Sequence, residues 1–200
     1  MDVEGIAGEL SISGFVVVED ALSHELRARL DDGCRDSAAP GFVPAAVGRG
    51  EQRMHDTSIR GDVIKWLDDT QAADRAFLAL MEGLRVGLNR QLYLGLLDYE
   101  CHYASYPVGA HYDKHVDTLS GQKNRLLSTV VFLNNEWAPI DGGELVLYRA
   151  ANQRAIAKIQ PKPGLMVLFL SEDFPHEVLP AARCRHSIAG WFRGRAPSRA

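Results

Sequence analysis

The second half of the chain consists of short extended segments separated by turn residues, and this pattern constrains the fold most. Alternating segments bounded by Gly, Pro and Asn are typical of antiparallel sandwiches and barrels. After Gly95 the sequence predicts eight strands: Tyr99–Tyr106, His111–Asp117, Leu126–Asn134, Glu144–Tyr148, Ala155–Ile159, Leu165–Leu170, Glu177–Pro180 and Ser187–Arg193.

The first half is mixed, with helices dominant. Ala73–Leu92 carries an apolar stripe at helical spacing that should pack against a sheet. A second helix is expected over Leu22–Leu30, with Ser23 as N-cap and Gly33 as its stop. Short strands are expected at Gly14–Val18 and within Ile59–Trp66, and a loop at Ala38–Gly50.

These elements predict a mainly β protein with N-terminal helices. The fold that suits them is a double-stranded β-helix, that is, a jelly-roll or cupin-like barrel. Two hundred residues suit one domain with a substantial core. Within this single domain (1–200), residues 1–95 would form a helical support and lid region, and residues 96–195 the barrel core.

Composition narrows the class of protein. A net charge of −4 gives no basis for nucleic-acid binding. The three cysteines form no CxxC motif, so a reducing compartment is expected. The acidic N-terminus resembles no signal peptide, and no apolar run is long enough to cross a membrane. A cytoplasmic protein, monomeric by default, is the expectation.

Two overlapping His-x-Asp pairs, His111/Asp113 and His115/Asp117, mark a metal site. Side chains two apart on a strand share a face, so either pair could join the distant His176 on one ion. Two histidines and one carboxylate favour non-heme Fe(II) and oxygen chemistry. The later pair is favoured by its place at a strand end, but spacing alone does not choose between them.

Arg185, nine residues after His176, supplies a cation beside that site. A guanidinium makes a planar two-point contact with a carboxylate, which suits the far carboxylate of 2-oxoglutarate. Ser187 lies two residues further on the same expected strand face and would add a hydroxyl donor.

From about Ser11 to Arg193 the chain resembles the prolyl hydroxylase domain family of Fe(II)/2-oxoglutarate dioxygenases. It is most similar to bacterial homologues of the oxygen-sensing prolyl 4-hydroxylases. The resemblance rests on the order and spacing of Ile59–Trp66, Tyr106-Pro107, Tyr112–Asp117, Phe132-Leu133-Asn134, Trp137, Asp141–Leu145, Pro175–Val178 and Arg185–Phe192.

The resemblance implies roles for individual residues. His115, Asp117 and His176 would hold the iron, and His111 and Asp113 match non-ligand positions. Arg185 would pair with the 2-oxoglutarate carboxylate. Around them the resemblance places Tyr106 on the co-substrate, Tyr112 beside the metal motif and Trp191 in the pocket wall, with Arg60, Asp62, Trp66 and Arg125 toward the substrate.

One position departs from the animal enzymes: Phe132 replaces a tyrosine that contacts the co-substrate carboxylate, and Ser187 or a water would replace that contact. The implied activity is hydroxylation of a prolyl residue in a cytosolic protein, with release of succinate and CO2. It requires Fe(II), 2-oxoglutarate and O2, with ascorbate as an expected reductant. A translation component is one candidate target. The alternatives are a hydroxylase of free proline or another small metabolite, and a non-catalytic 2-oxoglutarate sensor.

Overall fold

The computed structural model describes residues 1–35, 37, 40–46, 55–118 and 124–195. Within these ranges the helices are α1 (Val3–Ser13), α2 (His24–Arg35) and α3 (Ala72–Leu92). The strands are β1 (Phe15–Val18), β2 (Val43–Pro44), β3 (Val63–Trp66), β4 (Asp98–Tyr106), β5 (Tyr112–His115), β6 (Arg125–Phe132), β7 (Leu145–Tyr148), β8 (Ala155–Ile159), β9 (Met166–Leu170), β10 (His176–Val178) and β11 (Arg185–Arg193).

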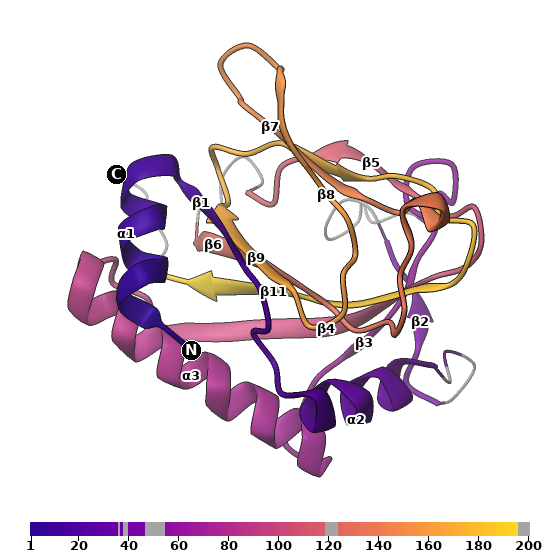
Figure 1. Ribbon diagram of the computed structural model, residues 1–200, viewed down its shortest axis with the longest axis horizontal. Coiled ribbons are helices and arrows are strands. Elements are labelled where there is room, and N and C mark those ends of the chain that lie inside the picture. The colour runs from indigo at the N-terminus through magenta and orange to yellow at the C-terminus, as the bar shows by residue number, and fades with distance from the viewer. Residues whose placement is uncertain (36, 38–39, 47–54, 119–123, 196–200) are drawn as a thin grey trace.

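Two antiparallel sheets form the body of the protein (Figure 1). The larger sheet has the strand order β1-β9-β6-β11-β4-β3-β2, and the smaller has the order β5-β10-β7-β8. The predicted mainly β, jelly-roll architecture is confirmed. The two sheets do not close on each other, because in the described part of the chain β1, β2, β5 and β8 are sheet edges.

The helices lie on the outer side of the larger sheet, opposite the smaller sheet (Figure 1). Helices α2 and α3 both pack on β4, and α1 packs on α3. The predicted apolar stripe of α3 supplies much of this core: Phe77, Met81, Leu84 and Leu88 are fully or almost fully buried. The helical layer therefore supports the sheet from behind and leaves its inner face for a cavity.

Alternate residues of strand β11 face the helix-covered core and the cavity between the sheets. Ile188 and Phe192 face the core under the helices. Arg185, Ser187 and Trp191 face the other way and line a cavity between the sheets. This alternation follows from the period-two geometry of a strand. It places the polar side chains of Arg185 and Ser187 inside the protein, on the cavity face of β11.

The predicted strands after Gly95 match the structure to within two residues at either end. Two expectations need correction. The segment His111–Asp117 is extended only over Tyr112–His115, so Asp117 lies beyond the strand. Helix α2 continues past Gly33 to Arg35. Of the loop expected at 38–50, residues 38, 39 and 47–50 lie outside the described residues, and Val43–Pro44 form β2.

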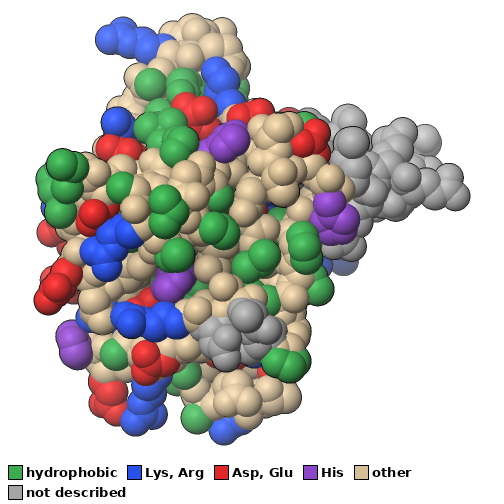
Figure 2. Space-filling model, turned by 90° about the vertical axis from the view of Figure 1, so that its right-hand side faces the viewer, with side chains coloured by type: hydrophobic (Ala, Val, Ile, Leu, Met, Phe, Trp, Pro, Cys, Tyr) green, Lys and Arg blue, Asp and Glu red, His purple; other side chains and the backbone are tan. Residues whose placement is uncertain are grey.

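No helix in the described ranges is both long enough and apolar enough to span a membrane. Among the described side chains on the face in Figure 2, basic, acidic and apolar groups are interspersed. The charge is not gathered by sign on that face.

Candidate active site

A cavity of about 590 Å³ lies between the two sheets. The smaller sheet contributes His115 and His176 to its lining, and the larger sheet contributes Tyr106, Arg185 and Trp191. Side chains that are far apart in the sequence therefore meet in one enclosed space, as in other concave small-molecule sites.

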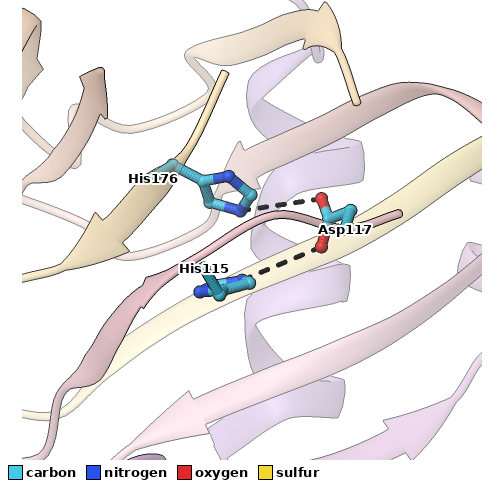
Figure 3. A group of neighbouring side chains, drawn as sticks. All are labelled: His115, Asp117 and His176. Atoms are coloured by element: carbon cyan, nitrogen blue, oxygen red, sulfur yellow. Dashed lines mark ion pairs between the residues drawn. The ribbon is translucent and has the colours of Figure 1, made fainter. Parts of the chain in front are cut away.

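His115, Asp117 and His176 converge at one end of this cavity (Figure 3). Antiparallel pairing of β5 with β10 sets His176 directly opposite His115. Asp117 follows two residues after β5 and points at both rings. Its carboxylate oxygens lie 3.8 Å from His115 Nε2 and 3.6 Å from His176 Nε2. One ligand atom from each residue lies within 4.8 Å of the others, so one metal ion can bind all three.

Backbone carbonyls fix which ring nitrogens are free. His115 Nδ1 lies 2.8 Å from the Asp113 carbonyl, and His176 Nδ1 lies 3.1 Å from the Phe174 carbonyl. A carbonyl only accepts, so both Nδ1 atoms carry the proton and both Nε2 atoms keep a lone pair. Hydrogen bonding of the second ring nitrogen is the usual way in which proteins orient a metal-binding histidine.

Burial and neighbouring groups together shift the pKa values of His115 and Asp117. It lowers the pKa of His115, and the neighbouring His176 lowers it further, so the imidazole is neutral near pH 7. Burial alone would raise the pKa of Asp117. The two histidines and the hydrogen bonds from Ser128 and Trp191 outweigh burial, so this pKa is lowered and the carboxylate is ionised. A neutral His115 imidazole and an ionised Asp117 carboxylate are the forms in which these side chains bind a divalent ion.

Ser128 is a site residue that sequence reasoning missed. Its hydroxyl donates to Asp117 Oδ2 over 2.5 Å and lies 2.8 Å from the hydroxyl of Ser171. Ser128 is 1% exposed in strand β6, opposite Trp191. The available signal was the hydroxyl pair Ser128-Thr129 inside the otherwise apolar run Leu126–Phe132, because buried hydroxyls need partners.

Tyr112 stacks on His115, with ring centroids 3.6 Å apart and planes inclined by 17°. The Arg60 guanidinium also lies over the Tyr112 ring, 4.6 Å from its centroid. This stacked column restricts rotation of the His115 ring.

Arg185 is fully buried in the same cavity but has no carboxylate partner among the described residues. Its Nε donates to the Gly143 carbonyl (2.9 Å) and its Nη1 to Ser187 Oγ (3.1 Å). In the described ranges, its Nη2 is the one fully buried side-chain nitrogen or oxygen without a hydrogen-bond partner. Burial lowers the pKa of Arg185, which is the sign of an uncompensated cation.

Aromatic rings enclose that guanidinium. Its central carbon lies 5.2 Å from the Tyr106 ring centroid and 5.0 Å from that of Phe132. Ser187 is the cross-strand neighbour of Phe132, so the two side chains lie on the same face of the larger sheet, and Ser187 lines the cavity. A buried cation held by two rings, one carbonyl and one hydroxyl is strongly unfavourable unless an anion joins it.

The other His-x-Asp pair is not part of this cluster. His111 Nε2 lies 3.4 Å from the Asp113 carboxylate and 3.1 Å from the Ser58 carbonyl. The Asp113 side chain is 57% exposed. The structure therefore brings His115 and Asp117, and not His111 and Asp113, together with His176.

Residues expected near a substrate lie along one wall. The Arg60 guanidinium forms two hydrogen bonds of 2.7 and 3.0 Å with Asp62, which is 2% exposed. Trp66 is half-exposed at the cavity rim. The Arg125 guanidinium lies 3.5 Å from the Trp191 ring centroid and pairs with Glu100. Because Val63–Trp66 pairs with β4, this part of the expected lid is a fixed strand.

Residues 101–193 match the 2OG-Fe(II) oxygenase superfamily. The solved structure of a Pseudomonas putida prolyl-4-hydroxylase is 38% identical, with a TM-score of 0.86 over 96% of this chain and 99% of that one. The chain belongs to the 2OG-Fe(II) oxygenase superfamily. It is accordingly a 2OG-Fe(II) oxygenase family member with prolyl hydroxylase homologues.

Two further relatives are animal proteins. A Trichoplax adhaerens prolyl hydroxylase, solved with a hypoxia inducible factor peptide fragment, is 26% identical with a TM-score of 0.82 over 96% of this chain and 88% of that one. The hypoxia-inducible factor prolyl hydroxylase of Caenorhabditis elegans is 31% identical over 165 residues, 77% of this chain. The chain spans 22% of the length of that nematode protein.

Proposed function

We propose that this chain hydroxylates a prolyl residue of a cytosolic protein, using Fe(II), 2-oxoglutarate and O2, with ascorbate as reductant. Fe(II) would bind to His115, Asp117 and His176. 2-Oxoglutarate would bind between that site and Arg185. When bound, the metal and co-substrate supply oxygen activation coupled to release of succinate and CO2. The residues 1–200 would act as one domain, with 1–95 supporting the two sheets.

The observation that carries the proposal is the buried guanidinium of Arg185. It lies in a cavity that also contains a three-residue metal site, and one of its nitrogens has no partner. A dicarboxylate satisfies both ends of such a cavity, because one carboxylate can meet the cation while the other end meets the metal. The roles proposed for the surrounding chain follow from that placement.

Ser187 and Tyr106 would complete the carboxylate site. Ser187 Oγ accepts from Arg185 Nη1, so its own hydroxyl hydrogen is free to donate to a bound carboxylate. Tyr106 is 4% exposed and its hydroxyl has no hydrogen-bond partner among the described residues. These two donors would compensate for the hydroxyl that Phe132 lacks.

The protein substrate would enter past Trp66 and Arg125 and rest against Trp191. Arg60 and Asp62 would hold Tyr112 and the metal-binding His115 in place through their ion pair and the stacked column. Indole rings suit a proline ring, which is apolar and rigid. The chain's part is to orient the two ends, exclude water and keep the free Nε2 atoms aimed at the ion.

Unbiased substrate capture tests this proposal. A His115→Ala variant, unable to complete turnover, serves as bait in a lysate, and captured proteins are incubated with the wild-type enzyme, Fe(II), 2-oxoglutarate and ascorbate. We expect a mass gain of one oxygen atom on a proline, with one succinate per oxygen. Oxygen on a free amino acid but on no protein would favour the small-molecule alternative, and 2-oxoglutarate binding without any turnover would favour the sensor.

A further inference from the structure

The larger sheet carries a buried histidine that the metal site does not use. His102 lies in β4, on the same strand face as Tyr106, and lines the cavity. It is 2% exposed. In the sheet it pairs with Trp66 on one side and with Ala189 on the other. Ala189, whose side chain is small, also lines the cavity.

Two tryptophans fix the His102 ring. The Trp66 ring meets it edge-on, with centroids 5.2 Å apart and planes at 85°, and the Trp191 ring lies 5.5 Å away at 56°. Trp191 also lies near Asp117 and helps to lower the pKa of that carboxyl. A single side chain therefore separates His102 from the metal site, on the wall where a substrate would rest.

The tautomer of His102 leaves one unpartnered acceptor. Nδ1 lies 3.0 Å from the Tyr103 carbonyl, so it must donate, and Nε2 carries the lone pair. No described residue donates to this Nε2 atom. In the described ranges, Arg185 Nη2 is the one fully buried side-chain polar atom without a hydrogen-bond partner. The His102 Nε2 atom has no partner either, so it is not fully buried and is open to the cavity.

The surrounding charges favour a neutral donor for this acceptor. Burial, and next the Arg60 guanidinium, lower the pKa of His102 to about 4. Arg125 acts in the same direction, while Asp62 opposes it and is itself paired with Arg60. Each of the two guanidinium groups is paired with a carboxylate, Arg60 with Asp62 and Arg125 with Glu100, so this wall offers no free counter-ion to a protonated amine. An amide N–H carries no net charge and needs no counter-ion.

We propose that His102 determines specificity for peptides, because its Nε2 atom accepts a hydrogen bond from a backbone N–H beside the target proline. This inference rests on the proposed prolyl hydroxylase function and names the part of the substrate that the wall recognises. Every peptide offers such donors whatever its side chains, so the contact selects a polypeptide over a free amino acid.

A hydrogen-bond cycle tests the inference. A library of acetylated peptides, each with one central proline and randomised flanks, is incubated with the wild-type enzyme, and the best substrate is remade with one backbone amide N-methylated at a time. Peptide dissociation constants are then measured for wild type, His102→Phe and His102→Gln. Phe keeps the aromatic volume without an acceptor, and Gln restores an acceptor.

We expect one N-methylated position to weaken wild-type binding about tenfold, the size of one hydrogen bond. His102→Phe should bind the unmethylated peptide equally weakly and lose nothing further at that position, and His102→Gln should regain sensitivity. Unchanged 2-oxoglutarate affinity would show that His102→Phe is folded. Equal losses for wild type and His102→Phe at every position would overturn the inference alone. A wild-type enzyme that consumes 2-oxoglutarate but hydroxylates no library proline would overturn the proposed function and this inference with it.

Discussion

The hydroxyl of Ser128 donates a hydrogen bond of 2.5 Å to the carboxylate of Asp117. This bond joins the larger sheet to the turn after β5 and fixes the one anionic ligand of the metal site. Orientation of the ligand set thus depends on a residue that contacts no metal itself.

Ser128→Ala should weaken Fe(II) binding. Loss of a partner that orients a metal ligand typically costs ten- to a hundredfold in affinity, so we expect about tenfold or more. Anaerobic titration calorimetry with Fe(II) measures the change. Ser128→Thr keeps the hydroxyl and should retain most of the affinity. Equal affinity of wild type and Ser128→Ala would show that Asp117 is held without this bond.

Arg185→Met should abolish stabilisation by 2-oxoglutarate. The wild-type protein, at a ligand concentration of about 100 times Kd, should gain about 2.7 kcal/mol in the free energy of unfolding. The variant lacks the cation and should gain none, whereas its ligand-free form loses an unpaired buried charge and should stay folded. Thermal unfolding with and without 2-oxoglutarate measures both. Arg183→Ala, on the exposed surface two residues away, is the matched control and should respond like wild type.

Ser187 and Phe132 should share one function. Ser187→Ala removes the hydroxyl that would donate to the carboxylate, and we expect about a tenfold loss of 2-oxoglutarate affinity. Phe132→Tyr places a new hydroxyl on the ring that lies 5.0 Å from the Arg185 guanidinium, and in the Ser187→Ala background it should recover much of that loss. Titration of 2-oxoglutarate into the single and double variants checks this. If Phe132→Tyr has no effect in either background, the two positions are not interchangeable.

Asp31 should link stability to pH through its buried contact with His186, whose Nδ1 lies 2.8 Å away, and its ion pair with Arg35. Burial would raise the pKa of Asp31, but His186 and Arg35 outweigh it and lower it. The stabilisation is therefore present above the unfolded pKa of about 3.9 and is lost as pH falls through the lower folded value.

Asp31→Asn should reduce the free energy of unfolding by about 2 kcal/mol at pH 7, because two charge-assisted hydrogen bonds are lost. The difference from wild type should narrow below about pH 4, where the wild-type carboxyl is itself protonated in the unfolded chain. Urea unfolding across pH 3 to 7 provides the measurement. Asp32→Asn, on the exposed side of the same helix, is the matched control and should change stability little at pH 7. A pH-independent gap for Asp31→Asn would contradict the linkage.

Most of the fold was predictable because strands and α3 carry strong periodic patterns. Helix α1 was missed because its amphipathic pattern is weak and its stability comes from an Asp2 cap and packing on α3. Gly33 was read as a helix stop. In the structure the Tyr103 hydroxyl lies close to where a Cβ would be, so the glycine there permits close packing.

The local sequence pattern predicted a His-x-Asp metal site but could not choose between its two candidate pairs. Alternation on one strand made His111 and His115 equivalent, but β5 ends at His115 and its pairing with β10 sets His176 opposite it. That register depends on contacts sixty residues apart in the chain, which no local period reports. The resemblance to the prolyl hydroxylases supplied what the local pattern left open.

A comparison of the alanine variants of His115 and His111 tests the central claim most directly. Succinate formed from 2-oxoglutarate, together with Fe(II) affinity, is measured for wild type, His115→Ala and His111→Ala under the same conditions. We expect His115→Ala to lose both iron binding and succinate formation, and His111→Ala to keep both, because only His115 lies with Asp117 and His176. An active His115→Ala enzyme beside an inactive His111→Ala enzyme would contradict the assignment.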